Sequence, residues 1–239
     1  VGGGYDSNVF FDSPDESPQG AATLSIVPRL NIVTPNPKNF ELDFEVGATG
    51  TIYLSGGKSA TDQSDVGLNS KLLLSWLPIK WLKLSLSDLF QRSIEARMGE
   101  STDDFDRLYN RLNVKVGFIP GGGALNFDFG YRLDVHWFES SDMSYANYYA
   151  HGVTFSGRWK FFPKTALVTN FGMSFTQHPE ESTIVNESMP VRASIGLVGL
   201  LTPKISTVAM VGYGNSLHAE GESYNMMLGS FEIGFTFTP

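Results

Sequence analysis

The stretch FELDFEVGATGTIYL, residues 40–54, alternates apolar and polar side chains with a period of two. Phe40 opens the apolar set and Glu41 opens the polar set. Successive side chains of a β-strand point to opposite faces, so this pattern predicts a strand with one apolar and one polar face. The alternation recurs in residues 108–118 and 125–137, and no long stretch carries apolar residues at the helical period. We therefore expect an all-β fold.

Prolyl turns recur along the chain at steps of 40 to 43 residues, at Pro37, Pro78, Pro120, Pro163 and Pro203. Longer polar segments lie between these turns, so that short and long connections alternate. Each step holds two strands, and the runs add up to about twelve strands. This repeat predicts an up-and-down antiparallel sheet with its tight turns at one end and its long loops at the other.

The composition excludes several classes of protein. The chain has 239 residues, no cysteine, and 17 Lys and Arg against 25 Asp and Glu, which gives a net charge of −8. Zero cysteine excludes disulfides, thiolate metal sites and a cysteine nucleophile. The acidic balance argues against a nucleic-acid partner, because such binding depends on cations that neutralise phosphates. No apolar run approaches the ~20 residues of a membrane-spanning helix. We expect a single domain over residues 1–239.

Three features indicate that lipid surrounds the apolar face. The predicted strands run for ~10 to 15 residues, longer than the usual ~5 to 6 of globular proteins. An even strand number with short turns at one end is typical of bacterial outer-membrane barrels. Aromatic residues gather near both strand ends, as in membrane girdles. The predicted girdle residues are Trp76, Phe118, Trp137, Tyr149, Trp159, Phe161 and Tyr213.

In hydrocarbon an open sheet edge would leave backbone groups unpaired, so the sheet must close on itself. The sequence therefore predicts a transmembrane up-and-down antiparallel β-barrel of about 12 strands. We expect it in the bacterial outer membrane, in contact with lipid and lipopolysaccharide. Its loops would be extracellular, and its turns and termini periplasmic.

The opening residues Gly3-Gly4-Tyr5-Asp6-Ser7-Asn8-Val9-Phe10 resemble the first-strand signature of β-barrel porins of Gram-negative bacteria. The resemblance covers under a tenth of the chain. Some members of that group accompany exopolysaccharide export or surface machinery, so the resemblance implies a role of that kind. Such relatives are often longer than twelve strands, and the final Thr238-Pro239 is similar to the start of another tight turn. A segment of a wider barrel is therefore an alternative reading.

The polar face would line the interior of such a barrel. By alternation, the predicted pore-lining residues are Arg29, Glu41, Asp43, Glu45, Lys71, Lys83, Arg111, Lys115, Asp128, Arg132, Asp134, Arg158, Lys160, Arg192 and Glu232. Charged side chains there predict a wet lumen. Twelve strands fall between the side-chain-filled barrels of eight and the open channels of sixteen, so both a narrow pore and a closed one fit the strand number.

Hairpin pairing assigns cross-strand partners to some of these charges. If Leu42 faces Ile32, Glu45 comes opposite Arg29. If Phe118 faces Leu125, then Lys115 comes opposite Asp128. Such pairs either hold the side chains against the wall or form a selectivity ring.

Two residues depart from the strand pattern. Pro28 cannot donate to a ladder, so we expect a bulge or a bend there. Asp88 follows the apolar set, and a bulge near Ser87 is favoured over a carboxylate in lipid.

Enzyme chemistry is not expected. The four histidines are His136, His151, His178 and His218, and none has a serine at a spacing that fixes a nucleophile beside a base, although a neighbouring strand could provide one. They are too scattered for a metal cluster. The acidic runs 12–16 and 103–106 match no defined calcium loop. We expect no catalytic residue, cofactor or metal.

The leading hypothesis is a passive channel or export conduit for polar solutes or glycans. The rival hypothesis is a structural or docking barrel within a cell-envelope machine for motility, secretion or export. In that rival, the lumen is occluded by its own charge pairs or by a protein partner.

Overall fold

The computed structural model describes residues 1–7, 20–54, 65–93, 106–179, 188–202, 204–218 and 223–236. Apart from two short 3₁₀ segments, Pro120–Gly123 and Ser141–Ala146, its regular structure is all β. The strands are β1 (Gly2–Asp6), β2 (Ala21–Ile26), β3 (Arg29–Val33), β4 (Phe40–Tyr53), β5 (Asp65–Ile79), β6 (Leu82–Ser93), β7 (Arg107–Phe118), β8 (Leu125–Phe138), β9 (Tyr148–Phe162), β10 (Thr165–Gln177), β11 (Ser188–Thr202), β12 (Ile205–His218) and β13 (Asn225–Phe235). The predicted all-β class is confirmed.

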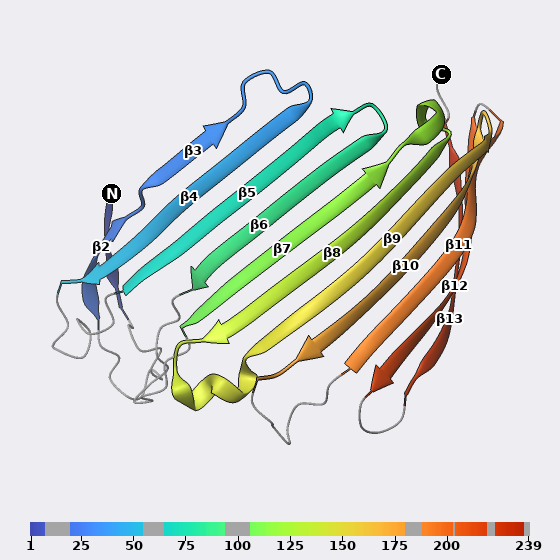
Figure 1. Ribbon diagram of the computed structural model, residues 1–239. Helices are drawn as coiled ribbons and strands as arrows, with labels where there is room; N and C mark the ends of the chain where they lie inside the picture. The colour runs from blue at the N-terminus through green and yellow to red at the C-terminus, as the bar shows by residue number, and fades with distance from the viewer. Residues whose placement is uncertain are drawn as a thin grey trace.

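The strands form one antiparallel sheet in which sequence neighbours are also spatial neighbours. Figure 1 shows the long strands running side by side and the sheet curling toward β13. Tight turns join β5 to β6 and β9 to β10 at one end, and the longer connections leave from the other. Within the described residues no ladder joins β1 to β13, so these strands are the two edges of the sheet.

Pro28 accounts for the difference between thirteen strands and the expected twelve. Both β2 and β3 pair with β4, and they are separated only by Val27 and Pro28. The register runs on from Ile26↔Gly50 to Arg29↔Gly47 without an inserted residue. The proline thus interrupts the ladder, as its missing N–H requires, but no bulge is formed. Together β2 and β3 fill one position in the sheet.

Two expected registers are wrong by two residues. Ile32 pairs with Phe44 instead of Leu42, and Glu45 therefore lies opposite Asn31 and not Arg29. Phe118 pairs with Phe127, which places Lys115 opposite Gly130 and Asp128 opposite Gly117.

The physical reason for both shifts is a wider turn. In the first hairpin Pro35 and Pro37 cannot donate to a ladder, and pairing ends with the bond from the Thr34 amide to the Leu42 carbonyl. In the other hairpin, Gly121, Gly122 and Gly123 have φ of 67°, 68° and 92°. These left-handed conformations are readily available only to glycine, and they build the turn Pro120–Gly123, in a hairpin two residues wider than the expected pairing of Phe118 with Leu125.

The bulge expected near Ser87 is also absent. Asp88 pairs with Leu72 on one side and with Leu112 on the other, in unbroken register. Its carboxylate stays on the apolar face and accepts a 3.0 Å hydrogen bond from the Asn110 side-chain amide. A hydrogen bond lowers the cost of placing a polar group among apolar neighbours, so the strand has no need to bulge.

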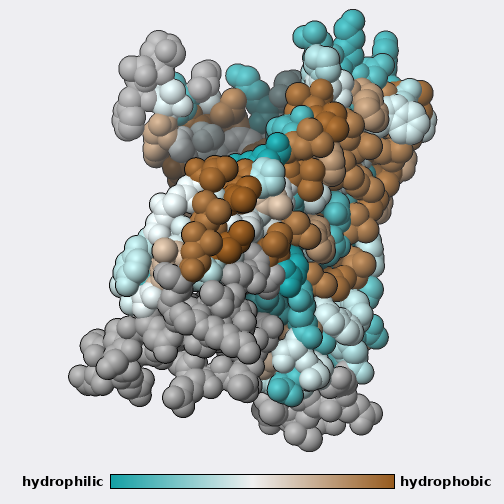
Figure 2. Space-filling view, turned by 90° about the vertical axis from the view of Figure 1, so that its left-hand side faces the viewer, coloured by the Kyte–Doolittle hydropathy of each residue, from teal (hydrophilic) through white to brown (hydrophobic). Residues whose placement is uncertain are grey.

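The two faces of the sheet differ sharply, and there is almost no buried core. Among the described residues the buried apolar side chains are Ala21 and Ala166. Large apolar side chains of alternate positions are exposed instead, including Phe129, Val153 and Phe231. We call this side the apolar face. Figure 2, viewed from the β2–β4 side, shows apolar side chains gathered across the middle and right of the molecule.

In the described part of the chain, neither helical segment has the length and the apolar character needed to cross a membrane.

Candidate functional site: the polar face of the sheet

The opposite side of the sheet, which we call the polar face, carries the charged residues. The ladder registers place all fifteen predicted pore-lining residues on this face, because each pairs across the strands with positions of the same parity. Glu45 lies opposite Lys71, for example, and Arg111 opposite Asp134. That these side chains line a pore stays a prediction.

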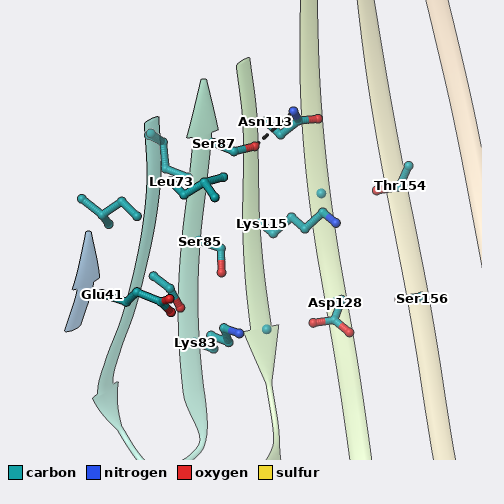
Figure 3. Close-up of a pocket in the computed structure, with 15 residues that line it drawn as sticks. Glu41, Leu73, Lys83, Ser85, Ser87, Asn113, Lys115, Asp128, Thr154 and Ser156 are labelled. Atoms are coloured by element: carbon teal, nitrogen blue, oxygen red, sulfur yellow. Dashed lines mark hydrogen bonds between the residues drawn. The ribbon is translucent and has the colours of Figure 1, made fainter. Parts of the chain in front are cut away.

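A pocket of about 530 Å³ lies on the polar face over β4 to β9. Figure 3 shows Lys83, Lys115 and Asp128 projecting from neighbouring strands into it. Glu41, on β4, lies at the opposite side of the pocket from Asp128. Serines on β6 form much of its floor, and the Ser87 hydroxyl accepts a hydrogen bond from the Asn113 amide at 3.3 Å. Short hydroxyl side chains leave room above the sheet, so this surface offers hydrogen-bonding groups and both signs of charge to a polar solute.

Asp134 is the centre of a charged cluster nearer the long-loop end of the polar face. Its side chain is only 8% exposed, and its carboxylate accepts from the Arg111 guanidinium, from Arg132 Nε at 3.0 Å and from the Tyr109 hydroxyl at 3.2 Å. The Arg111 guanidinium lies 5.5 Å from the centre of the Tyr109 ring. Two guanidinium groups share one carboxylate, so the cluster carries a net positive charge.

A second cluster joins four segments at the long-loop end. Arg92 donates two hydrogen bonds to the Glu139 carboxylate, at 2.6 and 2.8 Å, and its guanidinium lies 3.6 Å from Asp106. It also donates to the Val66 carbonyl. Strand alternation does not predict this cluster, because 47 residues separate Arg92 from Glu139. No local signal predicts such a pair.

The predicted girdle residues lie on the apolar face in two bands. Near the tight turns, Trp159 packs on Phe161 at 5.7 Å between ring centres, and Phe118 stacks on Trp81 at 6.3 Å. Trp76 is 46% exposed in the same band. Near the long-loop end Trp137 lies 6.2 Å from Tyr149, and Tyr213 is 49% exposed. Contact of these rings with a membrane interface stays a prediction.

The structure places one serine beside a histidine. The Ser216 hydroxyl lies 3.2 Å from Nε2 of His218, and it also accepts a hydrogen bond from the Tyr224 amide. The backbone amide of His218 donates a hydrogen bond to the Ser223 hydroxyl. These bonds tie β12 to the start of β13, which gives the pair a structural role in the hairpin. Within the described residues, no three His, Asp or Glu side chains are placed to hold a metal ion. The acidic run 12–16 and residues 103–105 lie outside those described.

Neither the family models nor the curated proteins with which the chain was compared match it.

Proposed function

We propose that the chain forms an outer-membrane β-barrel that acts as a passive channel or export conduit for polar solutes or glycans. The observation that carries the proposal is the near absence of a buried apolar core beside a sheet face of exposed Phe, Val, Leu and Trp side chains. Apolar surface of that extent needs an apolar environment. Lipid supplies one if the polar face encloses water.

The dimensions of the sheet agree with a membrane location. Strands β4 to β13 contain 11 to 15 residues, and about 9 to 11 tilted residues cross a bilayer core. In this proposal β1 closes against β13. Because β2 and β3 fill one position, the sheet has twelve strand positions. This even number makes the closing pair antiparallel, as the other pairs of neighbouring strands are. The loops face the exterior and the turns and termini face the periplasm, with lipopolysaccharide around the outer rim.

Conductance tests the channel directly. Purified full-length protein added to a planar lipid bilayer is expected to give stepwise increases in current, because the charged polar face would hold a water-filled path. Detergent alone and heat-denatured protein are the controls. A barrel that is folded in lipid and conducts nothing would contradict the channel and favour the structural or docking barrel.

Closure of the sheet can be tested with introduced cysteines, because the chain has none of its own. Gly3→Cys on β1 is combined in turn with Gly229→Cys, Phe231→Cys or Ile233→Cys on β13. A closed barrel brings one of these pairs within the ~4.4–6.8 Å between Cα atoms that a disulfide spans. We expect one intramolecular crosslink in lipid, read as a shift in gel mobility that reductant reverses.

Gly3→Cys with Phe129→Cys on β8 is the matched control, since β8 lies in the middle of the sheet. Crosslinks between two molecules, with none within one, would show that the edges pair with a second copy and that a single chain does not close.

A further inference from the structure

A second pocket on the polar face differs from the first in the sign of its charges. It has a volume of about 500 Å³, lies over β7 to β11, and adjoins the first pocket, with which it shares Asn113, Lys115, Gly130 and Thr154. Its cations are Lys115, Arg132 and Arg192, and no carboxylate is among the residues that line it. A pocket with three cations and no acid is unexpected in a chain with a net charge of −8.

The ladder registers explain how the three cations come together. Lys115, Gly130, Thr154, Gly172 and Arg192 form one row across five neighbouring strands. At ~4.8 Å per strand, Lys115 and Arg192 stand about 19 Å apart along the sheet. Arg132 is two residues beyond Gly130 on β8 and lies between them. The cations therefore form an arc long enough for an extended ligand.

The positive charges in this pocket are only weakly balanced by the protein. Within the described residues, no carboxylate oxygen lies within 4.0 Å of Lys115 or Arg192. Arg132 does pair with Asp134, but Asp134 is shared with Arg111. Nearly half of the Arg132 side chain remains exposed. Asp128 is the nearest other acid by register, one row away, and it lines the mixed pocket with Lys83.

The floor of the pocket leaves room for a ligand. A Cβ atom built on Gly172 would have no atom within 4 Å, so open space lies above the backbone there. Asn113, Thr154 and Ser174 bring amide and hydroxyl groups to the lining of the same pocket. Such groups pair with hydroxyl-bearing ligands, while the guanidinium and ammonium groups bind carboxylates or sulfates through charge-assisted hydrogen bonds.

We propose that Lys115, Arg132 and Arg192 form a binding site for an acidic oligosaccharide on the polar face. The inference rests on the proposed function, because it names the solute class that the conduit would carry. The site holds the acidic groups of the sugar along the arc of cations, and its hydroxyl groups meet Asn113, Thr154 and Ser174.

Binding is tested with the full chain in detergent micelles, by calorimetric titration with an oligogalacturonate of six sugars at low salt. The neutral control ligand is maltohexaose. The double variant Lys115→Gln, Arg192→Gln is expected to lower the affinity for the acidic sugar by about tenfold or more, because it removes two charge-assisted contacts. Gly172→Val, which fills the open space and keeps every charge, is expected to weaken binding too. Added salt weakens wild-type binding by screening.

Lys71→Gln is the matched control, since it removes a cation from the same face outside this pocket. Equal weakening by Lys71→Gln, or binding of maltohexaose as tight as that of the acidic sugar, would overturn the site. An acidic peptide of equal charge that binds more tightly would overturn the assignment to a sugar.

The two proposals fail separately. If the protein conducts but the double variant changes neither acidic-sugar affinity nor the anion-to-cation permeability ratio, the site is wrong and the channel stands. If the protein binds the acidic sugar as described and never conducts, the site stands and the channel is wrong.

Discussion

Replacing Val153 by arginine is expected to lower the free energy of unfolding in lipid vesicles by about 2–4 kcal/mol, the cost of a cation facing lipid near the bilayer midplane. Val153 is 51% exposed on the apolar face, and it lies in the middle of β9, between Tyr131 and Met173 on the neighbouring strands. Urea titration of protein in vesicles, followed by tryptophan fluorescence, measures the change.

Ser156→Arg is the matched control for this substitution. It lies three residues further along β9 on the polar face, directly opposite Asp128. An arginine there meets water and a carboxylate, so we expect a change within about 0.5 kcal/mol. If Ser156→Arg is the damaging variant and Val153→Arg is harmless, lipid does not touch the apolar face. That order would remove the basis of the membrane proposal.

The fold class was predictable because strand alternation depends only on the chain itself. Phe40 to Leu54 carries the period in its own sequence, and the repeat of prolyl turns orders the strands without knowledge of any contact. Which residues share the polar face follows from the same parity. Whether β1 meets β13 depends on the two ends of the sheet, about which alternation says nothing.

Contacts between strands were less predictable, because register depends on turn geometry. A turn wider by two residues keeps every side chain on its face but moves each cross-strand partner. The faces of Glu45 and Lys115 were therefore predicted with the correct parity while their partners were not. Asp88 shows a different limit. Its carboxylate is accommodated on the apolar face by a hydrogen bond from Asn110, which lies on another strand. The sequence marks Asp88 as an exception without indicating how it is accommodated.

Asp134→Asn is expected to lower the free energy of unfolding by about 2 kcal/mol. The substitution removes the charge that two guanidinium groups share and leaves Arg111 on β7 and Arg132 on β8 as diagonal neighbours without a carboxylate between them. Removing one partner of a fully buried ion pair costs about 3–5 kcal/mol. We expect less here, because the two arginine side chains are 44% and 46% exposed and water can screen their repulsion. Urea unfolding in vesicles again provides the measurement.

Asp128→Asn separates this effect from the mere loss of an acid on β8. Asp128 lies on the same face six residues earlier, and within the described residues no cation lies within 4.0 Å of its carboxylate. Its loss should therefore change stability by about 0.5 kcal/mol or less. Equal losses in the two variants would show that the Asp134 cluster adds nothing to stability.

Both variants raise the positive charge of the polar face by one, so both should increase the preference of the proposed channel for anions. Only Asp134→Asn also frees Arg132 for the acidic-sugar site, so only that variant should bind oligogalacturonate more tightly.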